Sequence, residues 1–109
     1  MNAKCARIRR LNDELRQNHR GGSIFVTAGV QALGGELISQ IDAAVARFES
    51  FDSANDPYDE HDFGAFEVGE YRLFFKIDYY DRSLLNGSPD PSDPRVTHRV
   101  LTIMLAEEY

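Results

Sequence analysis

The residues best suited to chemistry gather in one stretch of the chain, between positions 49 and 70. This stretch holds eight carboxylates and neither Lys nor Arg. Like charges at this density repel one another unless a cation or a basic partner neutralises them. The eight acids are Glu49, Asp52, Asp56, Asp59, Glu60, Asp62, Glu67 and Glu70. The pattern therefore predicts a surface that binds a basic partner.

Six of these acids form the predicted partner-binding surface: Asp56, Asp59, Glu60, Asp62, Glu67 and Glu70. The four at positions 56 to 62 can take the place of nucleic-acid phosphates against Arg and Lys side chains of a target protein. The plainer alternative is a solvated loop, whose charge aids solubility or is neutralised by basic residues of the same chain.

The same stretch contains side chains of the metal-ligating types. His61 lies between Glu60 and Asp62, and His98 lies on a later, apolar run. Carboxylates and imidazoles that converge from separate elements bind Mn²⁺ or Zn²⁺. The enzyme alternative is therefore a metal-dependent hydrolase or nuclease around His61, Asp62 and His98. The spacing matches no zinc or calcium-loop pattern, so we predict no metal, no other cofactor and no catalytic residue.

No potential nucleophile has a catalytic motif around it. Cys5 lies in a charged segment without a Cys–His signature, and the glycine-rich pieces lack the Gly-Lys-Ser/Thr end of a phosphate loop. A single cysteine cannot form an intrachain disulfide, which favours a reducing compartment. Residues 1–20 lack the apolar core of a signal peptide, and no stretch approaches the roughly 20 apolar residues of a membrane span. We expect a cytoplasmic protein without membrane contact.

Charge is unevenly distributed along the chain. The 109 residues have a net charge of −6 at pH 7 and a pI of about 4.9, which disfavours phosphate-driven binding of nucleic acid. Residues 1–20 nevertheless carry six basic and only two acidic side chains. We therefore expect a basic or nucleic-acid-binding protein as the partner, and no direct contact with nucleic acid.

Hydrophobic periodicity predicts the elements that position these residues. Apolar side chains at helical spacing predict two helices, over residues 3–19 and 36–48. Runs rich in β-branched and aromatic residues predict strands over residues 23–28, 66–68, 71–80 and 96–106, the last in a central position. The order α-β-α-β-β-β predicts an α+β fold in a single domain, residues 1–109, with an antiparallel sheet and helices packed on one face. Within it, residues 1–20 form a basic helix, and residues 49–70 form an acidic loop and the first hairpin strand.

The alternation of the strand over residues 71–80 assigns its two faces. We expect the helix over residues 36–48 to pack on the face that carries Leu73, Phe75 and Ile77. The opposite face is half apolar, with Phe74, Val100 and Met104, and it needs cover. Either the first helix supplies that cover, or two copies of the chain bury this face as a homodimer.

Five segments of the chain are distinctive in combination: LNDELR (11–16), TAGVQALG (27–34), NDPYDEHDFG (55–64), FFKIDYYD (74–81) and RVLTIMLAEEY (99–109). Together they resemble a small uncharacterised bacterial family, domain of unknown function 3768. The family's loop more often has Gly where this chain has Asp59, so this chain carries one more acid. The resemblance implies no activity or catalytic residue. It implies an origin mostly in alphaproteobacteria, often on plasmids and other mobile elements.

The acidic stretch and this resemblance together predict a small acidic, non-enzymatic binding protein. A concrete form is an anti-defence inhibitor of a mobile element, for example an anti-CRISPR or antirestriction protein that occupies the nucleic-acid channel of its target. The metal-dependent hydrolase or nuclease is the alternative, and a structural or regulatory subunit is a third interpretation.

Overall fold

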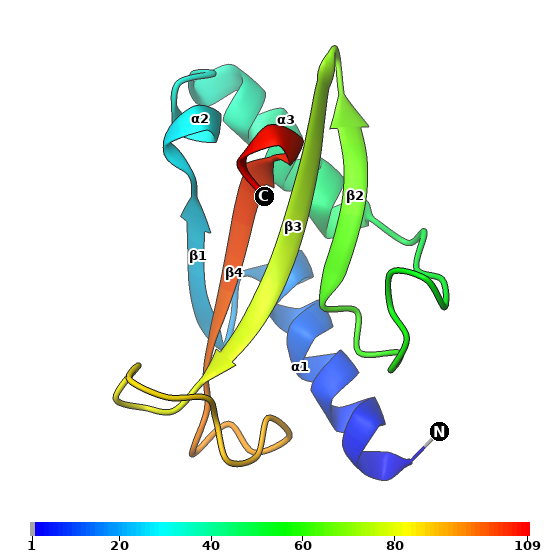
Figure 1. Ribbon diagram of the computed structural model, residues 1–109, viewed down its shortest axis with the longest axis vertical. Helices are drawn as coiled ribbons and strands as arrows, with labels where there is room; N and C mark the ends of the chain where they lie inside the picture. Colours follow the sequence, from blue (N-terminus) through cyan, green and yellow to red (C-terminus); the bar gives the residue numbers. More distant parts are fainter. Residues whose placement is uncertain (1) are drawn as a thin grey trace.

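Figure 1 shows the computed structural model of the protein, which describes residues 2–109. Its helices are α1 (Ala3–Asn18), α2 (Ala28–Gln31), α3 (Gly35–Arg47) and a final 3-10 turn, η1 (Ala106–Glu108). Its strands are β1 (Gly22–Val26), β2 (Phe63–Val68), β3 (Tyr71–Tyr80) and β4 (His98–Leu105). The strands form one sheet in the order β1-β4-β3-β2. The predicted α+β fold is confirmed, and β4 has the predicted central place.

The two long helices lie within one residue of their predicted bounds. The short helix α2 was not predicted, because residues 29–35 contain three glycines and suggest a loop. Thr27 starts this helix, since its hydroxyl accepts a hydrogen bond from the Val30 N–H at 3.4 Å. Within residues 2–109, no helix is long and apolar enough to cross a membrane.

The sheet is mixed, because β1 runs parallel to β4 while the β4–β3 and β3–β2 pairs are antiparallel. The expectation of a wholly antiparallel sheet therefore misses one pairing. The chain passes from β1 to β2 through α3, and a helical crossover delivers the next strand in the same direction. β4 is two antiparallel steps from β2, so it also runs in the direction of β1.

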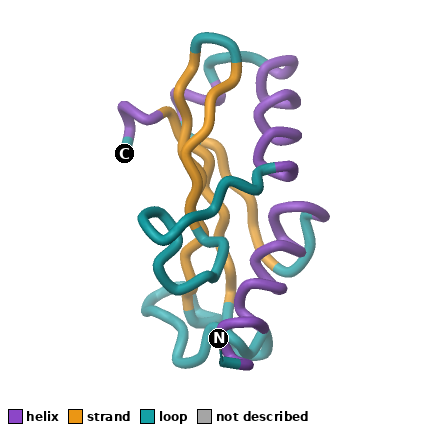
Figure 2. The backbone as a smooth tube through the Cα atoms, turned by 90° about the vertical axis from the view of Figure 1, so that its right-hand side faces the viewer, coloured by secondary structure: helices purple, strands orange, loops and turns teal. Residues whose placement is uncertain are grey.

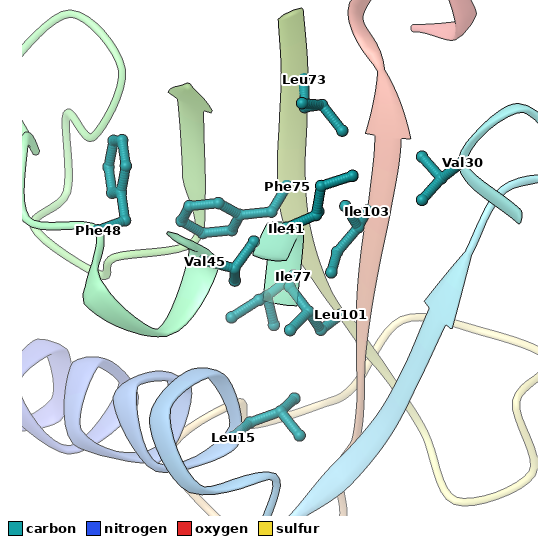
Figure 3. Packing of buried hydrophobic residues seen from close by; sticks show 10 residues of the cluster. All are labelled: Leu15, Val30, Ile41, Val45, Phe48, Leu73, Phe75, Ile77, Leu101 and Ile103. Atoms are coloured by element: carbon teal, nitrogen blue, oxygen red, sulfur yellow. The ribbon is translucent and has the colours of Figure 1, made fainter. Parts of the chain in front are cut away.

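The hydrophobic core lies between the sheet and the helices (Figure 3). Ile41 and Val45 of α3 are fully buried against β3. The β3 residues in this core are Leu73, Phe75 and Ile77. The predicted packing of the α3 stripe on this face is therefore confirmed. Leu15 of α1 extends the core toward the lower end of the sheet.

The other face of the sheet carries the C-terminal end of the chain, opposite the helices (Figure 2). The Tyr109 ring packs edge-on against Phe74 and Phe63, with centroid distances of 5.4 and 5.9 Å. Glu108 fixes this turn by accepting a hydrogen bond from the Thr27 hydroxyl at 2.6 Å. Of the two sources of cover left open by the sequence, the first helix does not supply it, because α1 packs on the core face. The C-terminus covers part of this face instead.

Candidate functional site

The acidic loop, residues 49–62, joins α3 to β2 and is organised around the carboxylate of Asp56. Asp56 is only 6% exposed, and its two oxygens accept the N–H groups of Glu60 at 2.8 Å and His61 at 3.1 Å. Asp59 and His61 adopt left-handed φ angles of 57° and 59°, which Asp and His tolerate better than most residues. Asp56 is therefore an internal anchor that fixes the backbone of the loop.

The basic helix α1 contacts this loop directly. Arg9 Nη1 donates to Asp59 Oδ2 at 2.7 Å, and His61 Nδ1 lies 2.9 Å from Asp13 Oδ1. The His61 ring also stacks on Phe51, with a centroid distance of 3.9 Å and an interplanar angle of 4°. Neutralisation by basic residues of the same chain, one of the two interpretations left open by the sequence, thus occurs at Asp59.

Arg16 of α1 fixes the start of the loop to the end of α3. Its side chain is 2% exposed and donates to the carbonyls of Val45 at 2.8 Å and Phe48 at 2.9 Å. It also donates to Asp13 Oδ1 at 2.9 Å. The last carbonyls of a helix lack intrahelical donors and carry partial negative charge. The buried guanidinium is therefore compensated by the C-terminus of α3 and by Asp13.

A second polar network joins the loop to the sheet. The Tyr79 hydroxyl donates to Glu60 Oε1 at 2.8 Å and accepts from Asn12 Nδ2 at 2.8 Å. Asn12 Oδ1 in turn accepts from Arg99 Nε at 2.8 Å. Burial raises the pKa of Tyr79 and lowers the pKa of Arg99. Buried polar groups that satisfy one another specify a single arrangement, so this network fixes Glu60 and the end of the loop.

Asp62, the last residue of the loop, carries the most perturbed carboxyl of this region. Its pKa rises to about 6, first because burial disfavours the charged form and next because Glu60 is close. Asp56 and Asp78 raise this pKa further through their charge. A carboxyl with this pKa exchanges its proton near neutral pH, which is a property of general bases and of pH-sensitive structural groups alike.

Three side chains of the loop could together hold a cation. Ligand atoms of Asp56, Asp59 and His61 all lie within 4.8 Å of one another. Each of them already has a protein partner: Asp56 accepts two backbone N–H groups, Asp59 pairs with Arg9, and His61 contacts Asp13. A cation would therefore have to displace protein contacts at all three positions.

His98 lies on the other face of the sheet. Its Nε2 is 2.8 Å from the Ser23 Oγ of β1, and strand alternation places it opposite the buried Arg99 of the core face. His61, in contrast, contacts α1 on the helix side. The structure therefore brings Asp62 close to His61 but does not bring His98 to them.

Five of the eight acids of residues 49–70 are exposed: Glu49, Asp52, Asp59, Glu67 and Glu70. These acids fall into two groups, one towards each end of β2, whose six residues span roughly 20 Å. Glu67 and Glu70 lie at the hairpin end of that strand, whereas the other three belong to the loop. The predicted partner-binding acids thus occupy two separate places.

Tyr58 is the exposed aromatic residue of the acidic loop, with a relative exposure of 73%. It directly precedes Asp59, which lines a shallow groove together with Glu49, Phe51 and His61. Glu49, Asp52, Tyr58 and Asp59 are hereafter called the loop surface. Sequence reasoning missed Tyr58, although the signal was present: it is an aromatic residue in a segment without apolar period, where a core position is not expected.

The comparisons with known proteins give one match. No curated protein and no solved structure matches the chain. A family model described as "Protein of unknown function (DUF3768)" matches residues 26–108. The match covers the acidic loop and strands β2, β3 and β4, and it confirms the resemblance seen in the sequence strings. The chain therefore belongs to the DUF3768 family.

Proposed function

We propose that this protein is a non-enzymatic binding module that engages a basic protein through the loop surface. The observation that carries the proposal is Tyr58, which is 73% exposed beside the exposed Asp59 on a loop anchored by the buried Asp56. An exposed aromatic side chain on a fixed loop gives a large contact area at a small entropy cost. Neighbouring carboxylates attract a basic partner and raise its rate of association.

The carboxylates support this proposal unequally. Asp59 is exposed and remains the main charged contact of the six predicted acids, although it shares its charge with Arg9. Asp56 and Glu60 are engaged inside the protein and act by holding the loop. Glu49 and Asp52, which were outside the predicted set, add exposed charge to the same loop as Tyr58.

The sharpest form of the proposal is an inhibitor that occupies the channel of a nucleic-acid-binding protein. Basic residues in such a channel would pair with the carboxylates of the loop surface in place of phosphates. The origin on mobile elements that the resemblance implies makes an anti-defence role, against CRISPR or restriction proteins, the specific version that we favour. We place this interaction in the cytoplasm, because the lone Cys5 fits a reducing compartment.

A metal-dependent hydrolase or nuclease is the second candidate, and the cluster of Asp56, Asp59 and His61 is the observation in its favour. Calorimetry with Mn²⁺ and Zn²⁺ on chelator-treated protein separates the two candidates. Micromolar one-to-one binding that is lost in His61→Ala would support the enzyme. Our proposal expects no stoichiometric binding.

Affinity capture with the full chain as bait, analysed by mass spectrometry, tests the proposed function. The comparison bait is the double variant Glu49→Lys/Tyr58→Ala, and the charge-matched control is Glu107→Lys, at an exposed residue of η1. We expect the wild type and the control to retain a basic protein that the double variant releases. Equal capture by all three baits would contradict the proposal.

A further inference from the structure

The free edge of β1 carries backbone groups that have no partner within residues 2–109. The Thr27 N–H donates to the Ile103 carbonyl of β4 at 3.1 Å. Along a strand, the backbone N–H and C=O groups of successive residues point alternately to the two sides. Phe25 and Ser23, two and four positions before Thr27, therefore also turn these groups toward β4. The N–H and C=O groups of Gly22, Ile24 and Val26 therefore point away from the sheet.

This edge also lacks the usual protection against pairing. β1 has the sequence GSIFV, without a charged residue or a proline, and it is the outermost strand on its side of the sheet (Figure 1). The opposite edge strand, β2, includes the exposed Glu67. Unprotected, apolar edges are templates for another strand, whereas charged edges resist pairing.

We propose that β1 pairs with β1 of a second copy of this chain, antiparallel, about a two-fold axis at Ile24. Ile24 then faces the partner's Ile24, and Gly22 faces the partner's Val26. Each of these hydrogen-bonded pairings exchanges two bonds, so the contact gains about six backbone hydrogen bonds. The two four-stranded sheets become one continuous sheet with the helices of both copies on the same side.

The side chains in this register complement each other on both faces. On the open face, Phe25 is 57% exposed and lies opposite the partner's Ser23, which is small enough to leave room for the ring. On the helix face, Ile24 is only partly buried at the border of the core, and the partner's Ile24 covers it. The contact thus covers the Phe25 ring on one face of the backbone ladder and the Ile24 pair on the other.

Charge explains why the occupant is a second copy rather than an unrelated strand. Arg20, which lies 3.6 Å from Glu14 and is 78% exposed, precedes β1. The exposed carboxylate of Glu108 accepts a hydrogen bond from Thr27, just after β1. In an antiparallel pair of β1 strands, the end that carries Arg20 in each copy lies beside the end that carries Glu108 in the other copy, so the favourable contact forms at both ends. Such self-complementarity is the property that a two-fold interface requires.

Sedimentation of the full chain across micromolar concentrations tests this inference. We expect a mass of twice the 12.4 kDa chain. Phe25→Lys should weaken dimerisation at least about tenfold, because it puts two like charges at the centre of the contact. The charge-matched control is Leu85→Lys, at a residue that is 81% exposed in the β3–β4 connection, and it should leave the dimer unchanged.

A second pair of variants separates pairing from folding. Ile24→Pro removes an N–H that points away from β4, at a position where an edge strand tolerates proline, and it also trims a side chain at the border of the core. Ile24→Val trims that side chain too but keeps the N–H. We expect a folded monomer for Ile24→Pro, judged by circular dichroism, and a dimer for Ile24→Val. A monomeric wild type at all concentrations, or a dimer that persists in both Phe25→Lys and Ile24→Pro, would overturn the inference.

Discussion

Replacing Arg16 by Met tests how the acidic loop is held. The guanidinium is 2% exposed and donates to three carbonyls at the end of α3, those of Val45, Ala46 and Phe48, at 2.8 to 3.1 Å. Met fills most of the space but donates nothing, so these carbonyls and the Asp13 carboxylate lose their donor. Hydrogen bonds to a charged group contribute about 1.5–3 kcal/mol each. Removal of the buried charge offsets part of that loss, and we expect a net destabilisation of about 3–5 kcal/mol.

Urea titration followed by circular dichroism measures this free energy of unfolding. The control is Arg20→Met, because Arg20 is 78% exposed and lies 3.6 Å from Glu14; its loss should cost less than about 0.5 kcal/mol. Hydrogen exchange should also show faster opening of the last turn of α3 in Arg16→Met. If the free energy of unfolding of Arg16→Met lies within about 1 kcal/mol of the wild-type value, water readily replaces the guanidinium and Arg16 does not anchor the loop.

Asp56→Ala should cost about 2 kcal/mol in urea titration and speed exchange of the Glu60 and His61 amides, whose acceptor is lost; unchanged exchange would refute the anchoring role. Asp62→Asn should stabilise the fold at pH 7 by about 1 kcal/mol, after allowance for its partial exposure. Because the native pKa of Asp62 is raised to about 6 from 3.8, the gain should fade as the pH falls from 6 toward 4, and a gain that is constant with pH would contradict this cause. Phe75→Ala should cost about 3–5 kcal/mol, since Phe75 is fully buried in the core; a loss below about 1 kcal/mol would refute the face assignment of β3.

The parts of the fold with regular apolar periods were predictable from the sequence. β3 alternates from Leu73 to Ile77, and its bounds agree with the predicted strand. α3 has a broad apolar stripe, and its packing on Phe75 followed from that stripe. Local pattern fixes which face of each element is buried. It does not fix strand direction between distant segments, and so the parallel pairing of β1 with β4 was missed.

The polar residues inside the structure were the harder part. Asn12 and Arg16 are polar residues of the basic helix, yet they are 0% and 2% exposed. The available signal was their spacing, because they lie four and eight positions after the buried Ile8 on one face of α1. Asp56 gave no such signal, since its burial arises from a turn in which Asp59 has a left-handed φ.

The most direct test of the binding proposal is the association rate between this protein and the partner obtained by capture. The rate is measured at low and at physiological ionic strength, where the Debye length is about 8 Å, for the wild type, Glu49→Lys/Tyr58→Ala and Glu107→Lys. The double variant and the control alter the net charge equally, and both leave the Asp59–Arg9 pair intact. We predict that only the double variant slows association markedly and flattens its dependence on salt. If both variants change the rate and its salt dependence to the same extent, overall charge governs binding and the loop surface is not the contact.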